Sequence, residues 1–95
     1  MNIFAPAFKS RAYLTWVKSQ PCVICGAPAD DAHHIKGVGN FSGTGMTAPD
    51  CLTMPLCRPH HEEMHRNPEL WPDQWAYVVQ TINQAFDEGV IKVDY

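Results

Sequence analysis

Cysteine and histidine residues recur along the chain at spacings that suit metal ions. In order along the sequence they are Cys22, Cys25, His33, His34, Cys57, His60, His61 and His65. A structural zinc ion takes only four such ligands, so this string is too long for one metal. It divides into two sets. One, the closed set, has cysteines and a histidine that would fill all four positions of a metal, and the other, the open set, has only histidines, one more than the three protein ligands of an open metal site. In so short a chain, a sealed metal beside an open one favours a small metal-dependent hydrolase.

Two pairs of ligands, each with two residues between its members, predict the closed site. The pairs are Cys22 with Cys25 and Cys57 with His60. Structural zinc is typically held by thiolates and imidazoles from two such pairs. Cys51 is left over, and we expect it to be a small buried thiol, although it could instead replace Cys57 or His60 as a ligand. A redox role for the first pair is disfavoured, because the strand–helix unit of thioredoxin-like motifs is missing.

The remaining histidines predict an open metal site. His61 and His65 are four residues apart, so on a helix their rings project from one face, one turn apart. They need a third ligand, which His33 or His34 would supply. Neighbours on a strand point to opposite faces, so one of these two would bind the metal. The other would be free to act as a general base near neutral pH.

Short helices and strands must position these ligands. Apolar spacing, proline and glycine predict helices over 8–19, from 59 to 66 and over about 72–88, and strands over 32–35 and 52–56. The segment 37–45 has four glycines and is predicted to be a loop. A backbone-lined phosphate cradle is the alternative there, although the segment lacks the spacing of a P-loop.

Two apolar stripes are expected to face the core. In the N-terminal helix the stripe comprises Phe8, Ala12, Trp16 and Val17. In the C-terminal helix it comprises Trp75, Val78, Val79, Ile82 and Phe86. Both follow helical spacing, and a stripe of this kind is far more often core than a binding surface.

The composition is that of a globular protein with one domain, residues 1–95. Hydrophobic residues make up 45% of the chain, with three Trp, three Tyr and four Phe, which is typical of a globular protein and not of a disordered one. A domain of this size buries only about two-thirds of the surface that its unfolded chain exposes, so a bound structural metal would add needed stability. No apolar run approaches the roughly 20 residues that span a bilayer, and a signal-peptide layout is missing. We therefore expect a cytoplasmic protein with reduced thiols and no membrane partner.

The charge is unevenly distributed. The net charge is −3, which by itself does not suggest nucleic acid. Residues 1–66 hold six of the seven basic residues with five acids, whereas residues 67–95 hold only Lys92 with five acids. Bound divalent ions would add positive charge to the first part, so a phosphate-attracting face is compatible with the negative total. We expect modest non-specific affinity with a shallow salt dependence.

Two segments of the chain resemble the signatures of HNH endonucleases, the ββα-metal or His-Me finger group. HHI at 33–35 resembles the first-strand signature, and PLCRPHHEEMHR at 55–66 resembles the second strand and helix in their zinc-knuckle form. The resemblance covers residues 22–66. It implies an α+β fold with a zinc-stapled ββα-metal core and flanking N-terminal and C-terminal helices. The wider pattern, with GTG-x3-PD, is similar to small phage and prophage recombination-enhancement, RecA-dependent nucleases.

The resemblance implies a metal-dependent endonuclease that cleaves nucleic acid, with DNA favoured. It makes His33, His61 and His65 ligands of the active-site metal and His34 the general base. Three imidazoles suit Zn²⁺, Ni²⁺, Co²⁺ or Mn²⁺ better than Mg²⁺, and the identity of the ion stays open. The narrower similarity implies a bacterial host cell and a recombinase filament as a candidate partner.

One position departs from the family pattern. The middle asparagine of the family, which orients the base histidine, falls on Leu52 in this chain. Asp50 is the nearest carboxylate and is expected to accept a hydrogen bond from the imidazole of His34. Thr53, Asn40 or a backbone carbonyl are the alternatives.

Substrate contacts and rival functions complete the expectations. The basic residues proposed to contact phosphate are Lys36, Arg58 and Arg66. A non-catalytic zinc module that binds DNA or a protein explains the closed site equally well, but leaves four histidines without a role. A metal-dependent hydrolase of another small substrate explains the histidines but not the family pattern.

Overall fold

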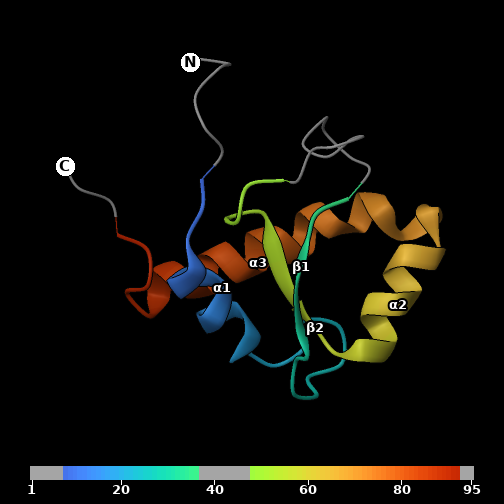
Figure 1. Cartoon of the computed structure of the whole chain (residues 1–95), viewed down its shortest axis with the longest axis horizontal. Helices are drawn as coiled ribbons and strands as arrows, with labels where there is room; N and C mark the ends of the chain where they lie inside the picture. The colour runs from blue at the N-terminus through green and yellow to red at the C-terminus, as the bar shows by residue number, and fades with distance from the viewer. Residues whose placement is uncertain (1–7, 37–47, 93–95) are drawn as a thin grey trace, which may run out of the picture.

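The protein is a small α+β fold built around a two-stranded sheet (Figure 1). The computed structural model describes residues 8–36 and 48–92. Its elements in chain order are α1 (Arg11–Lys18), β1 (Asp31–His34), β2 (Thr53–Leu56), α2 (Arg58–Arg66), the 3-10 helix η1 (Pro68–Asp73) and α3 (Gln74–Asp87). The predicted loop at 37–45 lies outside the described residues. None of the described helices is long and apolar enough to cross a membrane.

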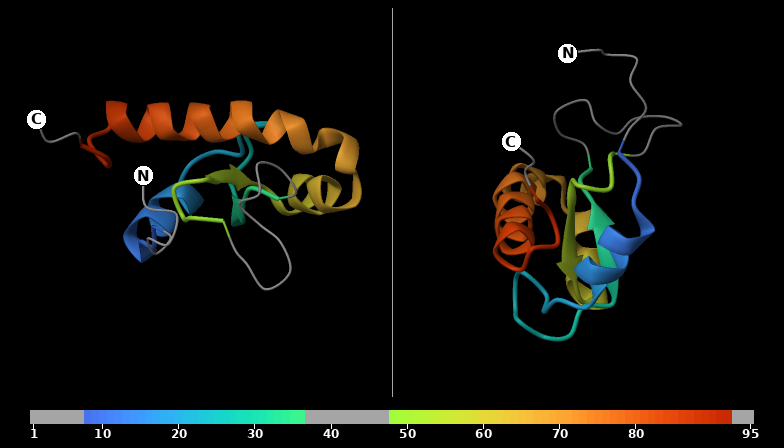
Figure 2. Two further views of the ribbon diagram at one scale, coloured as in Figure 1. Left: turned by 90° about the horizontal axis from the view of Figure 1, so that it is seen from above. Right: turned by 90° about the vertical axis from the view of Figure 1, so that its left-hand side faces the viewer.

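The two strands pair antiparallel and form the centre of the fold. The register pairs His33 with Met54 and His34 with Thr53. All four residues of β2 are buried, because α3 covers one side of the sheet and α1 the other (Figure 2). The outer edge of β2 is also partly covered, since the backbone N–H of Val23 donates to the carbonyl of Pro55 at 2.9 Å.

Local signals set the ends of the helices. Ser10 caps α1, because its hydroxyl accepts the backbone N–H of Tyr13 at 3.1 Å. Cys57 is the N-cap of α2, and Pro59 lies in the first turn, where a missing N–H costs nothing. Asn67 ends α2 just before Pro68, as the sequence predicts.

The predicted core face of α1 is wrong in part. Tyr13 and Val17 are the buried residues of this helix, whereas Phe8 and Ala12 are exposed. Val17 was predicted correctly, and Trp16 is partly buried against the same cluster. The buried face is therefore rotated by about one residue from the expected one.

The predicted core face of α3 is also wrong in part. The buried residues are Gln74, Val78, Thr81 and Ala85. Val79 is 59% exposed and Phe86 is 43% exposed, although both belong to the predicted stripe. Val78 was predicted correctly, and Ile82 is partly buried against the main core cluster, whereas Trp75 is 37% exposed. The helix begins at Gln74, after η1, and not at residue 72.

Candidate metal centres

A tight turn before β1 brings the first two cysteines together. Pro21 and Pro28 form an isolated bridge, and the backbone N–H of Cys22 donates to the carbonyl of Ala27 at 2.6 Å. Within this turn Gly26 donates to the carbonyl of Cys22 at 2.8 Å and has a φ of 78°. Glycine adopts this left-handed conformation without strain, which explains why it follows the second cysteine.

The closed ligand set assembles as predicted between this turn and the start of α2. Its members are Cys22, Cys25, Cys57 and His60, whose ligand atoms all lie within 4.8 Å of one another. Neighbouring atoms are 3.2 to 3.8 Å apart. A zinc tetrahedron with usual bond lengths has edges of about 3.5 to 3.8 Å. Three thiolates and an imidazole at these separations fit a structural zinc ion.

The surroundings favour the thiolate form at Cys22 but not at Cys57. At Cys57 a backbone hydrogen bond acts to lower the pKa, but burial and the neighbouring thiols of Cys25 and Cys22 raise it. Burial acts to raise the pKa of Cys22, but backbone hydrogen bonds from Cys57, Cys25 and Ile24 outweigh it and lower the pKa to about 6. Cys51 lies in neither ligand cluster of the described residues. Its thiol is only partly buried, and burial raises its pKa. The alternative in which Cys51 replaces a zinc ligand finds no support in this arrangement.

The open ligand set also comes together, from one strand and one helix. His33 on β1 faces His61 and His65 on α2, with ring centroids 4.9 Å and 5.2 Å apart. The Nε2 atoms of the two helix histidines are 2.9 Å apart. The ligand nitrogens of the three side chains all lie within 4.8 Å of one another, so one ion could be bound by all three.

A carboxylate holds the ring of His61. Its Nδ1–H donates to Asp31 Oδ2 at 2.8 Å, which leaves the lone pair of Nε2 directed into the cluster. This hydrogen bond is the largest influence lowering the pKa of Asp31. A carboxylate behind a histidine is the usual support of a metal-binding imidazole, because it fixes the ring and its tautomer.

The other two rings have different supports. His33 Nε2 lies 2.9 Å from Gln74 Oε1, and burial holds the pKa of His33 at about 4, so this imidazole is neutral. The ammonium group of Lys36 donates to His65 Nδ1 at 3.0 Å. Burial, then the charge of Lys36, lowers the pKa of His65.

His34 has a carboxylate partner on the other side of β1. Its Nε2–H donates to Asp50 Oδ1 at 2.8 Å, and Asp50 Oδ2 accepts the backbone N–H of Ser10 at 2.8 Å. Burial acts to raise the pKa of Asp50, but the hydrogen bond from His34 and the one from Ser10 lower it. The expected contact with Asp50 is thus present. Thr53 instead donates to the carbonyl of Asp50 at 2.8 Å, and Asn40 lies outside the described residues.

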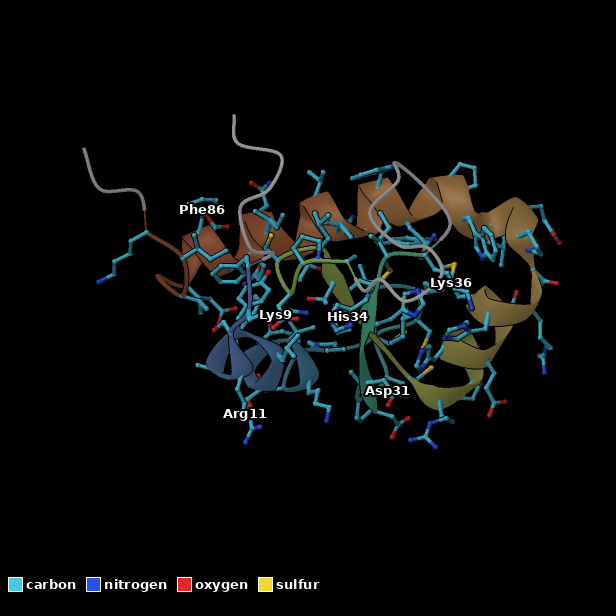
Figure 3. The ribbon with its side chains drawn as sticks, turned by 45° about the horizontal axis from the view of Figure 1, so that its top comes forward. Lys9, Arg11, Asp31, His34, Lys36 and Phe86 are labelled. Atoms are coloured by element: carbon cyan, nitrogen blue, oxygen red, sulfur yellow. The ribbon has the colours of Figure 1, made fainter. Side chains whose placement is uncertain are left out.

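The neighbouring histidines therefore face different groups. Figure 3 shows His34 on β1 between Asp31 at the start of the strand and Lys36 beyond its end. The side chain of His34 is 28% exposed and that of Asp50 only 8% exposed, so the ring can meet solvent while its partner is shielded. With Nε2–H donated, the lone pair of His34 Nδ1 remains available.

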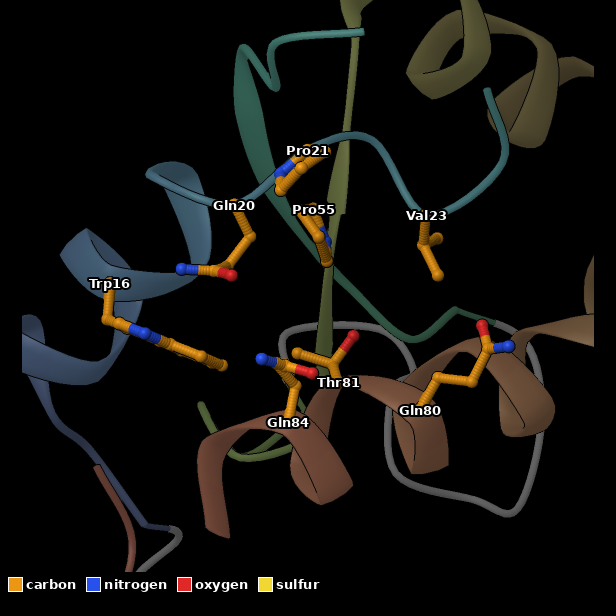
Figure 4. Close-up of a pocket in the computed structure, with 8 residues that line it drawn as sticks. All are labelled: Trp16, Gln20, Pro21, Val23, Pro55, Gln80, Thr81 and Gln84. Atoms are coloured by element: carbon orange, nitrogen blue, oxygen red, sulfur yellow. The ribbon is translucent and has the colours of Figure 1, made fainter. Parts of the chain in front are cut away.

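Two of the proposed phosphate contacts lie beside the open cluster. Lys36 contacts His65, and Arg58 Nε donates to Asp31 Oδ2 at 3.2 Å. Arg66 is exposed at the end of α2. A separate groove lies between α1, the turn at residues 21–28 that carries Cys22 and Cys25 (the cysteine turn), β2 and α3. It is lined by residues such as Trp16, Pro55 and Gln84 (Figure 4). None of the lining residues is charged or belongs to either ligand set.

Sequence reasoning missed two supporting residues. Asp31 lies two residues before His33 on the same strand, and that spacing puts both on one face, so strand alternation could have pointed to it. Gln74 follows His33 by 41 residues, and nothing local marks it as a partner of the cluster.

Comparisons with known proteins give a family but no activity. Residues 5–91 match DUF968, described as a protein of unknown function. The uncharacterized protein YdfU of Escherichia coli (strain K12) is 41% identical over 78 residues, which are 82% of this chain and 22% of that protein. This chain thus spans less than a quarter of that relative's length. No solved structure matches the chain. By the match over nearly its whole length, the protein belongs to the DUF968 family.

Proposed function

We propose that this protein is an HNH-type metal-dependent endonuclease that hydrolyses phosphodiester bonds of nucleic acid, with DNA as the favoured substrate. One observation carries the proposal. Consecutive residues of β1 face two different groups: His33 meets the histidines of α2, and His34 meets Asp50. The two side chains start from Cα atoms only about 3.8 Å apart, and the proposal requires that one phosphate and its attacking water reach both groups.

The open ligand set would hold the working metal. His33, His61 and His65 are its ligands in this proposal, and their chemistry suits Zn²⁺, Ni²⁺, Co²⁺ or Mn²⁺. When bound, a divalent ion supplies positive charge to a phosphate oxygen and to the leaving oxygen. The closed set already supplies four protein ligands, so a zinc ion bound there would have no open coordination position for substrate and would stabilise the fold.

His34 and Asp50 would move the proton. Nδ1 of His34 accepts a proton from water as the water oxygen bonds to phosphorus and the bond to the 3′ oxygen breaks. Asp50 holds the ring by its Nε2–H and stabilises the positive charge that the ring gains. The leaving oxygen takes its proton from solvent, so charge and atoms balance. Asp50 here takes the orienting role that an asparagine has in the HNH pattern.

Basic residues around the open cluster would bind the substrate. Lys36 and Arg58 are the nearest, and Arg66 follows His65 at the end of the helix. They are few, so affinity for DNA would be modest without a further partner. A recombinase filament that presents the DNA is the partner that the phage-type resemblance suggests.

A plasmid-nicking assay with added divalent ions tests the proposal. Wild type should nick, His34→Ala should bind the open-site metal and DNA yet lose about 100-fold or more in rate, and His33→Ala and His65→Ala should lose that metal. High metal concentration should partly rescue the last two variants. Each variant purified in parallel controls for contaminating nucleases.

Two results would contradict the proposal. If His34→Ala loses the metal while His33→Ala keeps it, the roles of the two histidines are exchanged. If wild type and variants all fail to cut DNA or RNA although the three-histidine site binds metal, the rival function, a non-catalytic zinc module for DNA or protein binding, is favoured.

A further inference from the structure

A buried glutamine stands behind the open ligand set. Gln74, the first residue of α3, is 0% exposed and lies against His33 and the backbone of Lys36 and Trp71. A carboxamide is costly to bury unless its hydrogen-bonding groups are satisfied. Gln74 uses all of them, with two donors on Nε2 and two acceptor positions on Oε1. So complete a set of partners fixes the side chain in one orientation.

The backbone partners identify which end of the amide is which. Gln74 Nε2 lies 2.7 Å from the carbonyl of Lys36 and 3.0 Å from that of Trp71, and both carbonyls can only accept. Gln74 Oε1 accepts the backbone N–H of Lys36 at 3.0 Å, which can only donate. Exchanging the amide nitrogen and oxygen would place two donors together at the N–H of Lys36 and two acceptors together at each carbonyl. The fourth contact, to His33, therefore meets an oxygen.

That oxygen decides the tautomer of His33. An amide oxygen has no hydrogen to give, so His33 Nε2, 2.9 Å away, must carry the hydrogen and donate it. The lone pair of this neutral imidazole is then on Nδ1. The helix histidine His61 is held in the opposite way, because Asp31 accepts its Nδ1–H and leaves Nε2 free.

We propose that Gln74 is a positioning residue that makes His33 bind the active-site metal through Nδ1. The inference rests on the proposed metal role of the three histidines and adds to it a supporting residue and a ligand atom. Gln74 does not contact the metal. It fixes the ring from behind, as carboxylates and carbonyls do at other metal sites, and it also ties the end of β1 to the start of α3.

The tautomer is measurable without any variant and without activity. Two-bond ¹H–¹⁵N correlation spectra of protein labelled with ¹⁵N-histidine, with the structural zinc in place and the open site empty, should show His33 protonated at Nε2. Added Zn²⁺ should shift the resonance of Nδ1. Protonation of His33 at Nδ1, or zinc on its Nε2, would overturn the proposal even if the protein cuts DNA.

A variant tests whether the glutamine matters for binding. Gln74→Leu keeps the volume but removes the hydrogen bonds, so it should weaken Zn²⁺ or Co²⁺ binding at the open site by roughly 10- to 100-fold. The zinc of the closed site should remain stoichiometric. Thr81→Val is the matched control, because it removes another buried hydrogen bond of α3, to the carbonyl of Tyr77, away from the histidines. It should leave metal affinity unchanged.

The outcomes separate this inference from the proposed function. Wild-type affinity in a folded Gln74→Leu protein would reject the positioning role while leaving the nuclease proposal intact. If wild type itself binds no metal at the three histidines, the nuclease proposal fails, and the inference that rests on it fails too. If Gln74→Leu does not fold, the wild-type spectra still decide the ligand atom.

Discussion

At the scale of single residues, the candidate site depends on what lies behind each histidine. His61 has a carboxylate, His33 an amide and His34 a buried carboxylate. A carboxylate and an amide both fix the ring and its tautomer, but only the carboxylate adds negative charge beside it. The arrangement therefore gives a carboxylate to the proposed base and a neutral partner to the buried ligand.

Asp50 should affect turnover and leave the metal alone. Asp50→Ala removes the acceptor for His34, so we expect a nicking rate roughly 10- to 100-fold lower, as for other supporting residues of metal sites. Metal content should stay at the wild-type level. Asp50 also accepts the backbone N–H of Ser10 at the start of α1. Ser10→Ala keeps that N–H and removes only the hydroxyl that caps α1, so it is the control for a weakened start of α1 with the contact between Asp50 and His34 intact. Wild-type rates in Asp50→Ala would reject the role and favour Asn40 or a backbone carbonyl.

Lys36 should oppose metal binding and favour substrate binding. Its ammonium group lies 3.0 Å from His65 Nδ1, and a nearby positive charge disfavours a divalent cation. Lys36→Met should therefore raise the affinity of the open site for Zn²⁺ by roughly threefold to tenfold, while lowering affinity for DNA and its salt dependence. Titration calorimetry for the metal and fluorescence anisotropy for DNA measure the two effects. Lys18→Met, at the far end of α1, should change neither, and a loss of metal affinity in Lys36→Met would contradict the expectation.

At the scale of elements, α2 serves both ligand sets. His60 on this helix reaches the closed set, while His61 and His65 reach the open one. Neighbouring helical positions point about 100° apart, so one short helix can face two metals. The closed set ties α2 to the cysteine turn and thereby fixes where the open set can form.

Loss of the closed set should unfold the domain. Cys57→Ser should lose zinc and lower the melting temperature sharply or prevent folding, because metal binding contributes directly to folding in so small a protein. Serine is a favoured N-cap residue, so the substitution improves the cap of α2 and any loss reflects the metal. Cys51→Ser is the control and should retain zinc. An unchanged melting temperature and zinc content in Cys57→Ser would contradict the assignment.

Ligand spacing could be predicted from the sequence, but the faces of the helices could not. The x2 pairs and the i, i+4 histidines indicated the members of both ligand sets, because short-range geometry brings the two members of each pair together. The joining of one pair to the other, and of His33 to the helix histidines, depends on the fold. In α3, by contrast, two stripes of helical spacing lie side by side. The buried one contains Gln74, Thr81 and Ala85, and it is selected by close packing on β2 and by the partners of Gln74. Those are long-range contacts that local periodicity does not contain.

At the scale of the whole molecule, folding buries His33 inside a protein of negative total charge. The net charge is −3, yet His33 is buried and resists protonation. An unfolded histidine titrates near about 6.5. Between that value and the pKa of about 4 in the folded protein, His33 is protonated in the unfolded chain and neutral in the folded one. Stability due to His33 is therefore present at neutral pH and is lost as the pH falls through this window.

Acid should thus weaken the fold before the carboxylates titrate. Urea unfolding of protein with zinc in the closed set and no metal in the open set should show a falling free energy of unfolding from pH 6.5 to 4.5. His33→Gln keeps a polar side chain but does not titrate, so its slope over this range should be smaller than that of wild type. Acid release of the closed-site zinc affects both proteins alike, and the difference in slope isolates His33. Below about pH 4, protonation of Asp31 and Asp50, whose pKa values are lowered in the fold, should steepen the loss in both proteins. Equal slopes above pH 4.5 would mean that His33 is protonated as readily in the folded chain as in the unfolded one, and would contradict the lowered pKa that its burial produces.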